Sequence, residues 1–98
     1  MEILAMKREI PGVGEDDFKP HLKAEAARVW ELYRIGVFRE LCFRKDRPAA
    51  VLMMECADVK ESDQVLETLP LVREGLIDFD GIPLVTYPGF ARLFAEYA

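Results

Sequence analysis

Glu40 and Glu55 are the first candidates for acid–base chemistry in this 98-residue chain. They fall in residues 37–44 and 49–57, two segments that we expect to pair as neighbouring strands with the two carboxyls as diagonal neighbours on one face. Burial and mutual repulsion can raise the pKa of one of two close carboxyls toward neutrality, as a general acid or base requires. The alternative is that both carboxylates lie in water at a pocket mouth or form an ion pair between subunits.

His21 and Glu25 are a second candidate for proton transfer. They stand four residues apart in a predicted helix, and that spacing places two side chains on one face. A histidine titrates near neutral pH, so the pair can act as a proton-handling dyad. The alternative is a surface histidine in an ion pair that only stabilises the helix.

Two arginines are candidates for holding an anionic substrate. Arg44 can bind a carboxylate through two parallel hydrogen bonds, and Arg39 can steer the same charge. Further candidates for substrate binding lie beside them or near the end of the chain: Phe38, Cys42, Met53 and Tyr87. Tyr87 either offers its phenol to a pocket or packs. Cys42 has no histidine on its strand to serve as a base, so nucleophilic catalysis is not expected.

Metal and nucleotide sites need residues that this chain does not supply in the right numbers. One histidine and two cysteines are too few for a zinc cluster, and the six scattered glycines form no phosphate-binding loop. We therefore expect neither a metal nor a cofactor. Cys42 and Cys56 are expected on opposite faces of the sheet, where a disulfide has poor geometry.

Composition limits the partners and the place of action. The length predicts a single domain over residues 1–98, and the net charge of −5 does not favour nucleic acid. No apolar stretch approaches the roughly 20 residues that span a bilayer, so no membrane is expected. The first residues lack the order of a secretory signal, which makes the cytoplasm the expected location.

Hydrophobic periodicity and turn residues predict six main elements in the order βαββαβ. Strands are expected at residues 2–10, 37–44, 49–57 and 76–87, and helices at residues 16–36 and 58–69. Asp16 or Asp17 is the expected N-cap of the first helix, with Pro20 tolerated in its first turn, and Asp58 caps the second. A last turn or helix over residues 88–98 carries an apolar stripe that must dock on its own chain or on a partner.

This order indicates an α+β fold of the ferredoxin-like type, an antiparallel sheet with both helices on one face. The last strand, interrupted at Gly81 and Pro83, is expected to be a bulged edge strand. Residues 51–54 put large apolar side chains on both faces of the sheet, and each one left in water loses about 1.5–3 kcal/mol. We therefore expect a second copy to cover the open face, giving a homodimer that forms a dimeric α/β barrel.

A four-residue loop over residues 45–48 sets the predicted register of the central hairpin. The predicted partners are Arg44 with Ala49, Cys42 with Val51, Glu40 with Met53, and Phe38 with Glu55. Those eight side chains are expected to face the dimer interior, where a pocket would lie. Arg39, Leu41 and Phe43 are expected under the helices, and a slip of one residue exchanges the two faces.

Three stretches of the chain form a further pattern: residues 21–25 (HLKAE), residues 37–41 (VFREL) and residues 68–71 (TLPL) with the later strand that ends in residues 84–88 (LVTYP). In these stretches the chain resembles the muconolactone isomerase family. Glu40 and Tyr87 stand where the family pattern has histidine. The resemblance implies a cofactor-independent isomerase that shifts a double bond in a small lactone by proton transfer, within a homo-oligomer built from dimers.

The resulting prediction is an enzyme that isomerises a small anionic or lactone-like compound. Glu40 or Glu55 is the expected base, with the His21–Glu25 pair as the second choice, and an arginine steers the substrate. The alternatives are a module that binds a small ligand without catalysis, including a stress-related one, or a chain that serves only for oligomerisation. A fold alone licenses no reaction.

Overall fold

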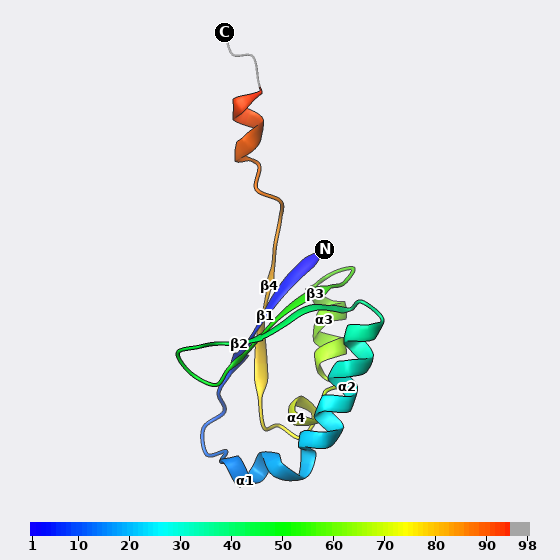
Figure 1. Cartoon of the computed structure of the whole chain (residues 1–98), viewed down its shortest axis with the longest axis vertical. Helices are drawn as coiled ribbons and strands as arrows, with labels where there is room; N and C mark the ends of the chain where they lie inside the picture. The colour runs from blue at the N-terminus through cyan, green and yellow to red at the C-terminus, as the bar shows by residue number, and fades with distance from the viewer. Residues whose placement is uncertain (95–98) are drawn as a thin grey trace.

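The computed structural model describes residues 1–94 and contains a four-stranded sheet with helices against it. The elements are β1 (Glu2–Arg8), α1 (Glu15–Phe18), the 3-10 turn η1 (Lys19–His21), α2 (Leu22–Arg34), β2 (Phe38–Phe43), β3 (Ala50–Glu55), α3 (Val59–Leu66), α4 (Pro70–Arg73), β4 (Asp78–Pro83) and the 3-10 turn η2 (Gly89–Leu93). The sheet order is β2-β3-β1-β4, and every neighbouring pair is antiparallel. The helices gather on one side of the sheet (Figure 1). The predicted α+β ferredoxin-like fold is confirmed.

The hydrophobic core lies between the sheet and the helices. Ile3 and Ala5 of β1 and Met54 of β3 are completely buried, and Leu32 of α2 packs over them. Ser62 of α3 is the buried polar residue of this region, and its hydroxyl donates to the carbonyl of Val59 at 2.7 Å. Because this bond satisfies the hydroxyl, α3 can lie flat on the sheet without an unpaired polar group.

The first helical region differs from its prediction. Pro20 has no N–H to continue an α-helix, and the chain forms the four-residue α1, a 3-10 turn that carries Pro20, and then α2. Neither Asp16 nor Asp17 is the N-cap of α1. Gly14 holds that position, and the Asp17 carboxylate accepts a hydrogen bond from the Gly14 N–H at 2.8 Å. The break turns α1 across the lower end of the molecule in the view of Figure 1.

The second helical region also differs from its prediction, because it contains an additional short helix. Asp58 caps α3 as predicted, with its carboxylate accepting from the Glu61 N–H at 2.8 Å. The predicted stop before Pro70 is confirmed, but Pro70 itself then opens α4, at the first helical position where a missing N–H does no harm. This short helix matters because its Leu71 N–H bonds to a side chain of the cavity described below.

A β-bulge in β2 changes the predicted faces. The predicted pairs Cys42–Val51 and Glu40–Met53 are confirmed, but Phe38 lies opposite Met54, and the register shifts between Phe38 and Glu40. The extra residue turns Phe38 to the helix side, where it is completely buried in the core. The prediction that Phe38 faces the open side of the sheet is therefore wrong.

The last part of the chain leaves the sheet early. β4 is an edge strand as predicted, but it ends at Pro83 and pairs with β1 without a register shift, so the predicted bulge is wrong. Of the predicted last element, η2 spans Gly89–Leu93, and residues 95–98 lie outside the described residues. The segment after β4 runs away from the body (Figure 1), and the overall extents are 64 × 29 × 21 Å. Within residues 1–94, no helix is long and apolar enough to cross a bilayer.

Candidate functional site

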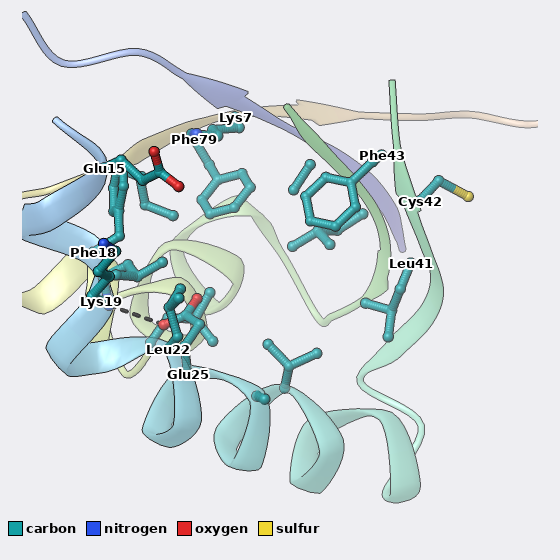
Figure 2. Close-up of a pocket in the computed structure, with 17 residues that line it drawn as sticks. Lys7, Glu15, Phe18, Lys19, Leu22, Glu25, Leu41, Cys42, Phe43 and Phe79 are labelled. Carbon is teal, nitrogen blue, oxygen red and sulfur yellow. Dashed lines mark hydrogen bonds between the residues drawn. The ribbon is translucent and has the colours of Figure 1, made fainter. Parts of the chain in front are cut away.

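A cavity of about 600 Å³ lies between the helix side of the sheet and the helical layer. Its sheet wall comes from β1 to β4, and its other wall comes from α1, α2 and the start of α4. Most of the lining is apolar, including Phe18, Leu41, Phe43 and Phe79 (Figure 2). A pocket of this size and character suits a small ring compound. The pocket predicted on the open face needs a second copy and stays a prediction, whereas the cavity of the single chain is on the opposite side of the sheet.

Small side chains help to explain where the cavity forms. Ala26 of α2 and Ala50 of β3 line it with no more than a methyl group each. Towards the hairpin end of the sheet, Phe43 is 77% exposed and Leu41 is 39% exposed, because no helix covers them. The cavity is therefore open to solvent on that side.

Glu25 is the acidic group of the cavity whose pKa is shifted. Its Oε1 accepts a hydrogen bond from the Leu71 N–H at 2.9 Å, which fixes the carboxyl against the start of α4. Burial raises the pKa of Glu25 above its usual 4.5, while the Leu71 N–H and the charges of Arg73 and His21 oppose the rise. A half-buried carboxyl with a raised pKa is suited to exchange protons with a ligand.

Lys7 supplies a cation to the same cavity. Its side chain is only 14% exposed, its Nζ lies 5.4 Å from the centre of the Phe18 ring, and its ion pair with Glu9 is long at 3.7 Å. Sequence reasoning missed this residue although a signal was present. Ile3, Ala5 and Lys7 alternate along β1 on the helix side, so a charged residue at the third position of that series marks a polar spot in an apolar wall.

His21 is near Glu25 but outside the cavity wall. It is half-buried in the 3-10 turn that precedes α2, and its charge opposes the rise of the Glu25 pKa. The structure thus keeps the two residues of the predicted dyad within electrostatic reach, but only Glu25 lines the cavity.

The carboxyls that were favoured as bases lie away from the cavity. Glu40 is exposed on β2 opposite Met53, and Glu55 follows two residues later on the same side of β3. Glu55 forms an ion pair with the amino terminus of Met1 at 3.0 Å. Both residues therefore share the open face as predicted, in water rather than in a closed pocket.

The two predicted anion-binding arginines are engaged by other groups. Arg44 forms two hydrogen bonds to Asp46 in the hairpin loop, at 2.9 and 2.6 Å. Arg39 donates from Nε to the Gly36 carbonyl at 2.6 Å. Arg39 also lines a shallow hollow with Tyr33 and Glu40 on the outer side of β2. Neither arginine lines the main cavity.

The remaining predicted binding residues are scattered. Phe38 lies in the core and Met53 lies half-buried on the open face. Cys42 belongs to the cavity rim, but its sulfur points away from the cavity (Figure 2). Tyr87 is 63% exposed beyond β4, with its ring edge-on to Phe90. Both cysteines are free, and no metal-binding group of three histidine, cysteine, aspartate or glutamate residues occurs within residues 1–94.

Comparison with known proteins gives a likeness of fold. No protein-family model matches the chain, and no curated protein sequence matches it. A similar solved structure is 5-chloro-2-hydroxyhydroquinone dehydrochlorinase (TftG) from Burkholderia phenoliruptrix AC1100, in complex with 2,5-dihydroxybenzoquinone. The TM-score is 0.71 at 17% sequence identity, over 91% of this chain and 98% of that one. At this identity the match supports the ferredoxin-like architecture and leaves the chemistry to be argued from the site.

Proposed function

We propose that this protein is a cofactor-independent enzyme that moves a proton between two carbon atoms of a small lactone-like or anionic ring compound. The observation that carries the proposal is the Glu25 carboxyl, which stands in an apolar cavity, is fixed by the Leu71 N–H and has a raised pKa. The predicted reaction class is kept, but its base is Glu25 rather than Glu40 or Glu55.

The proposed reaction needs only one base and one cation. Glu25 removes a proton from the carbon next to the substrate carbonyl, and the electron pair of that C–H bond moves to the carbonyl oxygen as an enolate. The ammonium group of Lys7 stabilises this oxygen, because a cation in an apolar wall acts strongly on developing negative charge. Glu25 then returns the proton to a different carbon, so that the double bond shifts without any oxidation.

The substrate class follows from the cavity and its charged groups. A volume of about 600 Å³ with aromatic walls accepts a single ring, and Phe18 and Phe79 offer flat contacts to it. The similar dehydrochlorinase structure contains 2,5-dihydroxybenzoquinone, which is also a small ring with oxygen substituents. This supports a small oxygenated ring as substrate and favours no particular lactone.

The test uses α-angelica lactone, a small lactone whose double bond shifts by proton transfer. In D2O, proton NMR follows deuterium entering the carbon beside the carbonyl together with formation of the conjugated isomer. We expect the protein to accelerate both above the rate in buffer. Glu25→Gln should lower the acceleration by about 100-fold or more, the usual contribution of a general base.

Two further variants make the test specific. Lys7→Met keeps the apolar stem but removes the charge, and it should slow the reaction while Glu25 remains in place. Glu31→Gln is the matched control, because Glu31 is on the exposed side of α2 in an ion pair with Arg28. If 2,5-dihydroxybenzoquinone binds in the cavity while α-angelica lactone exchanges no faster than in buffer, the protein is a binding module and the proposed reaction is wrong.

We also propose that the protein works as a homodimer formed through the open face of the sheet. Leu4 and Met6 of β1 and Val51 and Met53 of β3 point to this side and are only half-buried, and Ile82 of β4 is 42% exposed. An exposed apolar patch on one face of a sheet marks an interaction surface. A second copy packed face to face would cover them, while each cavity remains on the far side of its own sheet.

A further inference from the structure

The segment that follows β4, residues 85–94, is an apolar arm without support from its own chain. Five of its side chains, Val85, Tyr87, Phe90, Leu93 and Phe94, are between 63% and 89% exposed. The arm extends straight away from the sheet and the helices (Figure 1). The radius of gyration is 16.7 Å, whereas a compact chain of this length has a radius of about 13 Å.

The arm has its own local order but no bond to the body. Among the described residues, its backbone hydrogen bonds join Ala91 to Pro88 and Phe94 to Ala91, and the Tyr87 and Phe90 rings meet edge to face at 5.1 Å. The last bond to the sheet is just before it, from the Leu84 N–H to the Glu2 carbonyl at 2.9 Å. A segment with local order and large apolar side chains in water has the character of an interaction surface.

We propose that this arm docks on the body of a second copy of the same chain, and that the two copies exchange arms about a two-fold axis. The proposal rests on the face-to-face homodimer put forward above and adds the element that locks it. Ile82 belongs to the exposed patch of the open face, and the chain passes from it through Pro83 and Leu84 into the arm, so the arm starts beside that patch. A copy seated on the open face therefore meets the arm as well.

Size and charge both favour a second copy as the partner. Aromatic side chains bury about 150–250 Å² each, so two arms with three aromatic rings apiece supply much of the roughly 1,200–2,000 Å² of a stable interface. The arm carries a single charged residue within residues 85–94, Arg92, and the chain as a whole has a net charge of −5. The charge of the arm is thus opposite to that of the body it would meet.

The test is the mass of the protein in solution, measured by sedimentation equilibrium across a dilution series. The full chain should be a dimer, at twice the monomer mass of 11.2 kDa. A chain that stops after Leu84 keeps every described contact of the body, and we expect its dimer to dissociate at a concentration at least about 100-fold higher, since several large apolar side chains lose their cover. Phe90→Asp should weaken the dimer in the same direction.

Controls separate this inference from the proposals above. Gln64→Asp introduces the same charge at an exposed site on α3 and should leave the dimer unchanged. Circular dichroism of the shortened chain should show an intact fold. A shortened chain that dimerises as tightly as the full chain overturns the role of the arm but not the sheet dimer, whereas a full-length monomer at micromolar concentration overturns both. The lactone assay does not enter this measurement, so its failure remains distinguishable.

Discussion

Two opposing influences act on the pKa of Glu25. Burial in the apolar cavity disfavours its charged form, while the Leu71 N–H holds one oxygen of that form in place. The same burial that makes the group useful as a base also makes its ionisation unfavourable for the folded protein. The folded-state pKa therefore lies above the unfolded one, and this difference fixes how Glu25 affects stability with pH.

The expected result is a pH-dependent difference between the wild type and Glu25→Gln. The stabilising contribution of protonated Glu25 is fully present below about pH 4.5, its ordinary pKa, and is lost as the pH rises through the raised folded-state value. The free energy of unfolding of the wild type relative to Glu25→Gln should thus fall as the pH rises above about 4.5. Urea unfolding of both proteins across this range measures it, with Glu31→Gln as the control for net charge. A difference that stays flat or rises with pH contradicts the assignment.

The sequence indicates Glu25 through helical spacing, whereas it indicates Lys7 only through the alternation of β1. Helical spacing placed Glu25 beside Leu22 and near the apolar margin of the helix, where partial burial is readable from a 3.6-residue period. Lys7 was passed over because it follows the strand core and precedes charged residues, although its place in the alternation of β1 puts it on the covered face. Which element lies opposite a wall position is a tertiary fact, and periodicity does not contain it.

The elements around the cavity depend on how α2 ends and β2 begins. Gly36 has φ of +82°, and its N–H and that of Val37 bond back to the carbonyls of Tyr33 and Leu32 at 3.1 and 3.0 Å. This arrangement is a Schellman motif, in which the left-handed residue turns the chain out of the helix. It delivers Phe38 directly to the core, one residue before the bulge.

Gly36→Ala is expected to reduce stability by about 1–2 kcal/mol, because an alanine resists the left-handed conformation. Crowding is not the cause, since an added Cβ would lie 3.8 Å from the Arg39 side chain, an ordinary contact distance. Gly36→Asn is the matched variant: its side chain is larger, but asparagine tolerates positive φ and should cost less. Thermal unfolding of the three proteins decides the point. Equal losses for alanine and asparagine would show that space rather than φ limits this position.

Element order was readable from the sequence, whereas the irregularities between elements were not. Apolar runs and turn residues predicted all four strands, and the hairpin loop gave the pairing of Cys42 with Val51. The bulge beside Phe38 places a large side chain in the core, which is a matter of packing against distant segments. The break at Pro20 has a local cause, the missing N–H, but the sequence alone does not show whether a proline near a helix start is tolerated or divides the helix.

In the whole molecule, the two faces of the sheet differ in what covers them. One side of the sheet is covered by helices and encloses the cavity with Glu25 and Lys7, and the other side exposes a patch of apolar side chains. The sequence predicted that both faces need cover and placed a pocket on the open face, inside a dimer, whereas the cavity of the single chain lies on the helix side. In the proposed dimer, the open face serves assembly and each chain keeps its cavity for itself.

Met53→Glu tests whether the open face is the dimer interface. Met53 lies near the middle of the open face, opposite Leu4 on one side and Glu40 on the other, and is half-buried in the single chain. A carboxylate there should leave the single chain folded, because it can remain in water, but would be buried without a partner in the dimer, which costs several kcal/mol. Every 1.4 kcal/mol of this cost weakens association tenfold. We therefore expect the variant to be a monomer by sedimentation equilibrium at about 10 μM protein. Gln64→Glu adds the same charge on α3 and should remain dimeric. If Met53→Glu dimerises like the wild type, the open face is not the interface and the arms alone would have to hold two copies together.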